Sequence, residues 1–276
     1  MCFNQTMILP TYFISHGGGP WPYMPEMQSA NALLAQSLAD IPRQLVTRPK
    51  AILMVSAHWV SQDGFKVMAC AQPPMLYDYH GFPEHTYQIS YPAPGAPWLA
   101  DRVSQLLNGA SLHVQSDETR GFDHGAFVPA SIMYPDADVP ITQLSINAGY
   151  DPALHLSLGR ALAPLRKEGV LIVGSGLSYH NLREIYRGGS EASAQFDAWL
   201  QHVMLALPPQ EREKALIQWQ TAPCARQAHP EEDHLIPLMV ATGAAEDEPV
   251  TCVYHEKTAF ANITVSSFRF GAGNHD

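Results

Sequence analysis

Four histidines stand at the ends of apolar or glycine-rich segments that are spread along the chain. They occur in ISHGGGP, AILMVSAHW, GFDHGAF and GSGLSYHNL, and they are His16, His58, His124 and His180. An apolar strand that ends at a histidine beside small residues brings an imidazole to the rim of a sheet, where α/β proteins bind ligands. Imidazole nitrogens are common ligands of transition metals. The pattern therefore predicts a metal site assembled from remote segments.

His16 and His58 are the first candidates for metal ligands. Three glycines follow His16 and allow a close approach of the backbone to an ion, and His58 closes the most apolar predicted strand. Either residue alone would be a buried structural histidine, but two such strand ends together favour a shared metal. His234 in HPEEDHLIPLM, at the start of a predicted helix, is the expected third ligand. The neighbouring Asp233 would replace or orient it.

His124 and His180 are candidates for acid–base catalysis. His124 lies between Gly121 and Gly125 in a turn before a helix, and His180 follows the glycine-rich turn GSGLSY. Histidines outside regular structure can point into a cavity and transfer protons there. Several other histidines lack such surroundings and are expected to be structural or solvated, namely His113, His155, His202, His255 and His275.

Apolar strand-like runs alternate with helical patterns along the whole chain. Strands are predicted at Tyr12–Ser15, Ala51–Ala57, Lys66–Cys70, Ile141–Ile146, Val170–Gly174, Thr251–Tyr254 and Ile263–Phe270. Helices are predicted at Met27–Ala39, Pro97–Leu107, Pro152–Leu165, Ala192–Leu207, Glu211–Trp219 and Glu232–Thr242. This alternation predicts an α/β fold with a central mixed sheet, helices on both faces and the metal site at the strand C-terminal rim. No linker, repeat or low-complexity tract divides the sequence, so residues 1–276 are expected to form a single domain.

The segment between Gln72 and Pro97 is rich in proline and tyrosine. Proline prevents regular ladder bonding, so an ordered loop packed across one rim of the sheet is expected. Two interpretations stay open for this segment. It would either roof an aromatic pocket or form an irregular loop held down by buried aromatic rings.

The overall charge indicates small-molecule partners. The chain has 16 Lys and Arg against 26 Asp and Glu, a formal charge of −10, which argues against nucleic-acid and anionic-membrane surfaces. The apolar run at 51–57 is far shorter than the roughly 18 residues of a membrane span, and no export signal precedes it. The four cysteines form no CxxC pair, as is typical of a reducing compartment. We therefore expect a cytoplasmic protein, either a monomer or a homodimer.

Seven segments in one order resemble the type III extradiol aromatic ring-opening dioxygenases, the superfamily of the protocatechuate 4,5-dioxygenase catalytic subunit. The likeness is greatest to its DOPA-dioxygenase-like branch and covers nearly the whole chain. The segments are SHGGGP, VSAHW, YDYHGFPEHTYQISYPAPG, GFDHGAF, YPDADVPITQLSI, GSGLSYHNL and HPEEDHLIPLMVATGAA. By this resemblance His16, His58 and His234 match metal-ligand positions. His124 and His180 match active-site histidines, and His180 also lies where a fourth ligand would stand.

The resemblance implies an oxidoreductase that opens a catechol ring, from a DOPA-like or other substituted catechol, with O₂ and non-haem Fe(II). The isolated protein would also take Zn(II), which has no accessible redox change and cannot support this chemistry. His180 is the expected base and His124 the contact to oxygen or substrate. The Pro/Tyr-rich segment would supply the substrate-binding residues His80, His85 and Tyr91. A histidine in place of the superfamily's ligand carboxylate leaves the native metal open.

Two other functions are compatible with the same histidines. A zinc-dependent hydrolase would use them to activate water, although no general-base carboxylate is clearly placed outside Glu231–Asp233. A non-catalytic metal-binding interaction protein of the same fold would be expected to lose its ligand histidines. This chain keeps them all.

Overall fold

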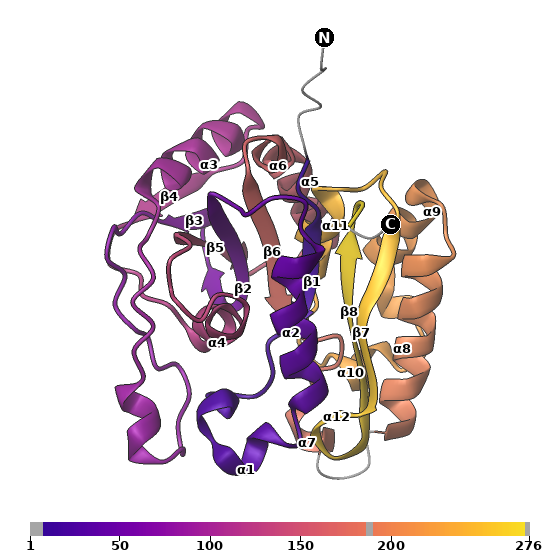
Figure 1. Ribbon diagram of the computed structural model, residues 1–276. Coiled ribbons are helices and arrows are strands. Elements are labelled where there is room, and N and C mark those ends of the chain that lie inside the picture. Colours follow the sequence, from indigo (N-terminus) through magenta and orange to yellow (C-terminus); the bar gives the residue numbers. More distant parts are fainter. Residues whose placement is uncertain (1–7, 186–189, 274–276) are drawn as a thin grey trace.

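One mixed sheet runs through the computed structural model, which describes residues 8–185 and 190–273 (Figure 1). Its eight strands lie in the order β4-β3-β5-β2-β6-β1-β8-β7. The strands are β1 (Thr11–Ser15), β2 (Ala51–Ser61), β3 (Phe65–Met68), β4 (Val114–Asp117), β5 (Ile141–Asn147), β6 (Val170–Gly176), β7 (Val250–Thr258) and β8 (Ile263–Phe270). Each predicted strand is present, and the predicted mixed α/β sheet is confirmed.

The centre of the sheet is parallel and its flanks are mixed. The neighbours β5, β2, β6 and β1 all run in the same direction, whereas β8 is antiparallel to β1, and β3 to β5. Because parallel strands end at the same edge, the carboxyl ends of β1, β2 and β6 meet at one rim. The residues that follow these ends are therefore brought together.

Helices cover both faces of the sheet, as predicted (Figure 1). In the view of Figure 1, α2 and α4 lie in front of the strands, and α5 and α11 lie behind them. The α-helices are α1 (Pro25–Gln28), α2 (Ala32–Gln44), α3 (Pro97–Gly109), α4 (His124–Met133), α5 (Pro152–Leu162), α6 (Pro164–Lys167), α7 (Leu182–Ile185), α8 (Ser190–Leu205), α9 (Pro209–Ile217), α10 (Ala225–Ala228), α11 (Ile236–Gly243) and α12 (Ala259–Asn262). Short 3₁₀ turns occupy Trp21–Tyr23, Glu84–Gln88 and Trp219–Thr221.

Several local predictions differ from the structure. The helix predicted at Met27–Ala39 is interrupted between α1 and α2, and the one predicted at Pro152–Leu165 is interrupted between α5 and α6. The strand β4 is not among the predicted strands, because it is short and polar and lacks the alternation that reveals a strand. The helix expected after His124 is present as α4, but His124 is its first residue rather than part of the turn before it. The helix predicted from Glu232 begins at Ile236, which leaves His234 in the turn before it.

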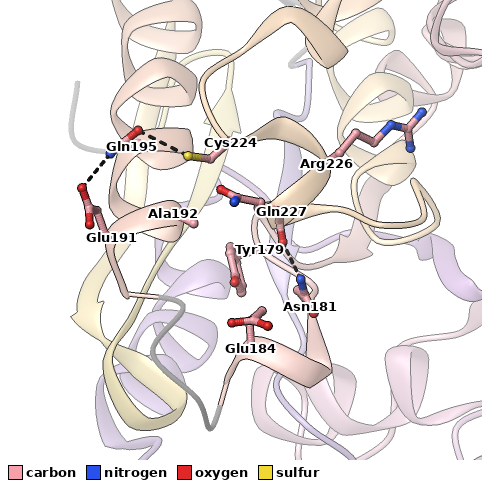
Figure 2. Close-up of a pocket in the computed structure, with 9 residues that line it drawn as sticks. All are labelled: Tyr179, Asn181, Glu184, Glu191, Ala192, Gln195, Cys224, Arg226 and Gln227. Atoms are coloured by element: carbon pink, nitrogen blue, oxygen red, sulfur yellow. Dashed lines mark hydrogen bonds between the residues drawn. The ribbon is translucent and has the colours of Figure 1, made fainter.

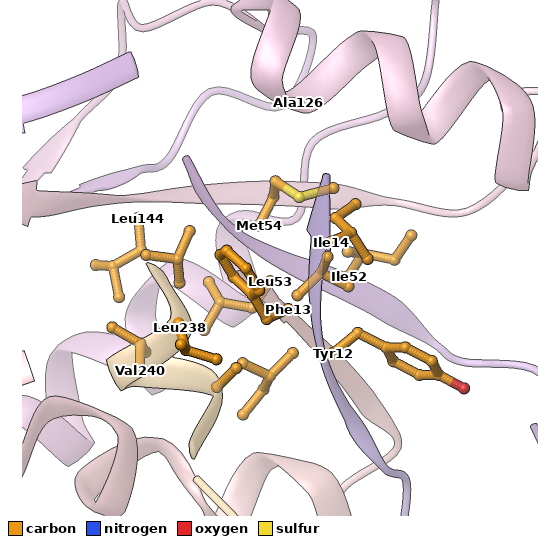
Figure 3. Close-up of a cluster of buried hydrophobic side chains, with 14 of the residues drawn as sticks. Tyr12, Phe13, Ile14, Ile52, Leu53, Met54, Ala126, Leu144, Leu238 and Val240 are labelled. Atoms are coloured by element: carbon orange, nitrogen blue, oxygen red, sulfur yellow. The ribbon is translucent and has the colours of Figure 1, made fainter. Parts of the chain in front are cut away.

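The core is the continuous apolar run of the central strands. Figure 3 shows Tyr12, Phe13 and Ile14 of β1 among residues of β2, β5 and α11, and these side chains are fully buried. Burial of one such large apolar side chain stabilises the fold by about 1.5–3 kcal/mol. The ends of β1 and β2 are therefore fixed by packing on both faces.

The segment from Gln72 to Pro97 is a loop, as predicted, with a single 3₁₀ turn. Its tyrosines hold it by hydrogen bonds to backbone carbonyls. Tyr77 donates to the carbonyl of Ile89 and Tyr79 to the carbonyl of Thr86, each at a distance of 2.6 Å. The aromatic rings also contact one another.

Among the described residues, no helix is both long and apolar enough to cross a bilayer. Cys70, Cys224 and Cys252 carry free thiols.

His155 is a buried structural histidine in α5. Its Nε2 accepts a hydrogen bond from the backbone N–H of Asn147 at 3.0 Å, and its Nδ1 lies 2.7 Å from the carbonyl of Asp151. The ring is therefore neutral, with its proton at Nδ1. Burial lowers the pKa of His155 from 6.5 to about 4.

This shift predicts a pH-dependent stability. The unfolded chain takes up a proton at His155 below pH 6.5 while the folded protein does not, so the stabilisation declines as the pH falls toward 4. Between pH 7.5 and pH 5 the loss from this one residue is about 2 kcal/mol. Urea unfolding of metal-free protein at both pH values should show a smaller pH dependence for His155→Gln. An equal dependence in both proteins would contradict this origin.

Candidate active site

His16 follows β1 directly at the rim. Its backbone N–H donates to the carbonyl of Gly176 at 3.2 Å, and the indole N–H of Trp21 donates to the His16 carbonyl at 2.9 Å. Gly17 has a φ of +83°, and a Cβ there would lie 2.2 Å from the Trp21 Nε1. Glycine is therefore required for the tight turn that leaves the His16 ring pointing into the site.

His58 lies where β2 changes its register. The pairing of β2 with β5 shifts between Val55 and Val60, as at a β-bulge, and a bulge re-aims the side chains within it. The His58 N–H donates to the Ser56 hydroxyl at 3.2 Å, and Arg120 donates to the His58 carbonyl at 3.3 Å. The strand thus continues past His58 to Ser61, further than predicted.

His234 is placed by a close approach of two backbones. A Cβ on Gly176 of β6 would lie 2.1 Å from the carbonyl oxygen of His234, so only glycine permits this contact. The next residue, Leu177, donates its N–H to the same carbonyl at 3.1 Å. The Asp233 carboxylate lies 2.8 Å from Nδ1 of His234 and orients its ring.

His124 begins α4, and Asp123 caps that helix. Asp123 is fully buried and accepts hydrogen bonds from the Ala126 N–H, the Ser56 hydroxyl and the Gln143 amide. Its charge is balanced by Arg120. The fully bonded carboxylate therefore fixes the start of the helix and its first side chain.

His180 lies in the loop after β6. Its N–H donates to the carbonyl of Ala228 at 3.0 Å, and its ring stacks on that of His234 with 3.4 Å between centroids. Nδ1 of His180 is 3.8 Å from a carboxylate oxygen of Asp233, which is too long for a hydrogen bond. That oxygen is buried and has no hydrogen-bond partner.

The five histidines converge at the rim of the sheet. The ring centroids of His16, His58 and His234 are 4.8–5.3 Å apart, and His124 is 4.0 Å from His58. The nearest ligand atoms form two sets, His16 with His58 and His124, and His180 with Asp233 and His234. Two of the expected ligands thus share a set, while His234 lies in the other.

Hydrogen bonds determine which ring nitrogen carries the proton. The Ser175 hydroxyl donates to the carbonyl of Gly125, so it accepts the hydrogen bond from Nδ1 of His16 at 3.0 Å. Nδ1 of His234 faces the Asp233 carboxylate, and Nδ1 of His58 lies 3.4 Å from a carboxylate oxygen of Asp78. The remaining Nε2 atoms point into the site, and those of His16 and His58 face each other at hydrogen-bond distance, 3.1 Å apart. Such converging lone pairs fit a divalent transition metal.

Burial keeps these rings neutral. It lowers the pKa of His58 to about 4, with the charge of His124 as the next cause, and it lowers those of His16 and His234 well below 6.5. Burial also lowers the pKa of His180, against the attraction of Asp233. Neutral imidazole is the form that binds metals and accepts protons.

A cavity of 440 Å³ opens onto the histidines. The polar part of its lining is His16, His58, Asp78, His80, His124, His180 and His234, and the apolar part includes Tyr79, Phe82, Leu177 and Phe260. His80 thus reaches the cavity, whereas His85 and Tyr91 are outside its lining. His85 is exposed with Nε2 3.1 Å from the Tyr23 carbonyl, and the buried Tyr91 hydroxyl donates to the carbonyls of Ala130 and Tyr134.

A second cavity of 550 Å³ borders the His180 loop (Figure 2). Tyr179 and Asn181, the two neighbours of His180, line it together with Glu184. Asn181 donates to the carbonyl of Gln227 at 2.7 Å, which helps to fix the loop.

Sequence reasoning missed Asp78, Ser175 and the buried role of Asp123. Asp78 stands in the YDYH segment, and both of its oxygens face active-site histidines. Ser175 lies inside β6, where a serine in an apolar strand is an available signal. Asp123 stands just before α4, and an aspartate in that position is a typical cap.

The fold and the histidine cluster together define a class of protein. Residues 10–271 match the family described as the catalytic LigB subunit of aromatic ring-opening dioxygenase. The chain therefore belongs to this family, within the type III extradiol dioxygenase superfamily. It is an oxidoreductase of the aromatic ring-opening class, in a metal-dependent family.

Named relatives are similar in sequence to this chain along most of their length. The chain is 37% identical to the "4,5-DOPA dioxygenase extradiol" of Beta vulgaris, over 97% of this chain and 98% of that protein. It is 36% identical to the Escherichia coli (strain K12) protein of the same name, with 88% of each chain covered. A crystal structure of an uncharacterized protein from Escherichia coli K12 has a TM-score of 0.76 and 32% identity, over 95% of this chain and 100% of that one.

The contact between Gly176 and His234 predicts that adding a methyl group destabilises the protein at Gly176 but not at an uncrowded glycine. Gly176→Ala would force β6 and the turn before α11 apart, which typically costs about 1–3 kcal/mol of unfolding free energy. Gly109→Ala is the matched control, because a Cβ there meets no atom within 4 Å at the end of α3. The control should be neutral or stabilised by up to about 1 kcal/mol. Urea unfolding that gives the same stability for wild type and Gly176→Ala would refute the constraint.

Proposed function

We propose that this protein catalyses extradiol cleavage of a catechol ring with O₂ and non-haem Fe(II). The observation that supports the proposal most is the set of buried, neutral histidines at the base of a largely apolar cavity. Their Nδ1 atoms face acceptors and their Nε2 atoms converge. A site of this kind suits a divalent metal together with a small aromatic diol.

We assign His16, His58 and His234 as the residues that would hold the metal. Their rings come from three separate segments. Those of His16 and His234 are buried, whereas those of His58 and His180 are partly exposed to a similar degree. When bound, ferrous iron would supply the redox-active centre that allows O₂ to react with a catecholate. His180 stands close enough to His234 for a fourth ligand, but its stacked ring and nearby carboxylate favour a proton-transfer role.

In this proposal His180 takes a proton from a catechol hydroxyl. Its ring is neutral before reaction, and the unpartnered oxygen of Asp233, 3.8 Å from Nδ1, can accept a hydrogen bond once the ring is protonated. His124 holds its Nδ1 proton against Asp78 and presents Nε2 to the cavity, where it contacts substrate or oxygen. These two histidines therefore orient the diol and carry its proton.

The cavity walls favour an aromatic substrate. Tyr79, Phe82 and Phe260 line the cavity, and His80 is the polar residue there that we propose to contact a ring substituent. Because relatives are named for 4,5-DOPA, a DOPA-like or other substituted catechol is the proposed substrate. Tyr91 would act only by holding the loop, since its hydroxyl is bonded to backbone carbonyls.

The proposal is tested by reconstitution without oxygen. Metal-free protein is loaded anaerobically with ferrous iron, then mixed with oxygenated buffer and a panel of catechols that includes DOPA. Oxygen uptake with a coloured ring-opened product is expected, and the zinc-loaded protein should show neither. Cleavage of an ester or amide by the zinc form, with no oxygen uptake by the iron form, would favour a hydrolase instead.

Variants separate the proposed ligands from the proton-transfer residue. His16→Ala, His58→Ala and His234→Ala should each lose bound metal and turnover, because one of three ligands is removed. His180→Phe should keep the metal and lose at least about 100-fold in kcat, the usual contribution of a general base. Metal content and kcat are measured for each. His113→Ala is the control, since this exposed histidine is remote from the cavity, and full metal content in His16→Ala would overturn the assignment.

A further inference from the structure

Asp78 contacts two active-site histidines from a loop that is separate in sequence from both of them. Its Oδ1 accepts the backbone N–H of His124 at 2.9 Å and lies 2.9 Å from Nδ1 of the same residue. Its Oδ2 lies 3.4 Å from Nδ1 of His58. The Asp78 side chain is 16% exposed, and it lines the cavity that holds these rings.

The two oxygens act on two different rings. Because Oδ1 receives both hydrogen bonds from His124, Oδ2 is left to face His58. An ionised carboxylate accepts hydrogen bonds only, so the His124 ring donates from Nδ1. At 3.4 Å, Oδ2 faces Nδ1 of His58 and favours an N–H there as well. Their Nε2 atoms then carry lone pairs directed away from Asp78 and into the site.

We propose that Asp78 is a positioning residue that fixes the proton of His58 and of His124 at Nδ1 at the same time. One carboxylate would thereby prepare a metal ligand and an active-site histidine together. His16 and His234 have acceptors of their own, Ser175 and Asp233. The inference rests on the proposed role of His58 as a ligand.

Hydrogen bonding of Asp78 is strong enough to alter its own ionisation. Burial raises the pKa of Asp78, but the hydrogen bonds from His124 lower it by more, so the net pKa is below its usual value. The group is thus a carboxylate at neutral pH. The loop itself has other anchors, since Tyr77 and Tyr79 are bonded to its backbone.

Asp78→Asn tests the proposal because an amide has one acceptor and one donor. If its oxygen keeps the two hydrogen bonds from His124, its NH₂ group faces Nδ1–H of His58, and two donors oppose each other. His58 relieves this conflict by moving its proton to Nε2, the atom that would bind the metal. The substitution therefore weakens metal binding although Asp78 is not a ligand.

The experiment has two readouts that do not depend on catalysis. Imidazole ¹⁵N spectra of the metal-free protein at pH 8, assigned with His58→Gln and His124→Gln, report which nitrogen is protonated. Zn(II) affinity is measured by competition with a chelating dye. We expect Nδ1–H at both rings in the wild type, Nε2–H at His58 in Asp78→Asn, and a 10- to 100-fold weaker Zn(II) affinity, as for other outer-shell partners.

Asp63→Asn is the matched control, because Asp63 is an exposed aspartate 3.9 Å from the exposed His113. It should leave both the spectrum and the Zn(II) affinity unchanged. An Nε2–H tautomer at His58 in the wild type refutes the proposal even if Asp78→Asn does not fold. An unchanged Zn(II) affinity in a folded Asp78→Asn also refutes it. Wild-type protein with the expected tautomers but no metal binding would instead contradict the proposed function and leave the role of Asp78 in place.

Discussion

The site depends on hydrogen-bond acceptors that hold the Nδ1 protons of its buried imidazoles. Without them each ring could exchange its proton between the two nitrogens or turn away, and the Nε2 lone pairs would not converge. Ser175, Asp233 and Asp78 supply these acceptors from a strand, a turn and a loop. Burial then excludes water and keeps the rings neutral. A buried polar cluster of this kind is stable only when its donors are paired.

The fold provides that arrangement through close backbone contacts. Parallel β1, β2 and β6 bring their carboxyl ends to one rim, and the lack of a side chain at Gly174 and Gly176 lets the chain at Pro237 and His234 approach β6. A register shift in β2 re-aims His58. The capped start of α4 then adds His124 from the opposite face of the sheet. The site is therefore carried by one strand, the start of one helix and turns that are anchored by backbone contacts, which favours precise geometry.

The proline-rich loop at 72–97 both packs its aromatic rings into the core and lines the cavity. Tyr77 and Tyr79 donate hydrogen bonds to carbonyls within the loop, and Tyr91 donates to carbonyls at the end of α4, so the loop is ordered without ladder bonding. This order places Asp78 and His80 at the cavity while Tyr91 stays in the core. The two interpretations of the segment, a pocket roof and a loop held by buried aromatics, therefore both describe it.

The sequence by itself determined the strands, the mixed α/β class and the histidines that gather at the rim, because apolar runs and glycine neighbours are local signals. It did not determine β4, since a short polar strand lacks a periodic pattern, and it placed His124 in the turn before α4 rather than at the first residue of that helix. It also could not pair Asp78 with His58 and His124 or Ser175 with His16. Those pairings join residues that are 20 to 159 positions apart, and only the packing of the strands and the loop decides which acceptor reaches which ring.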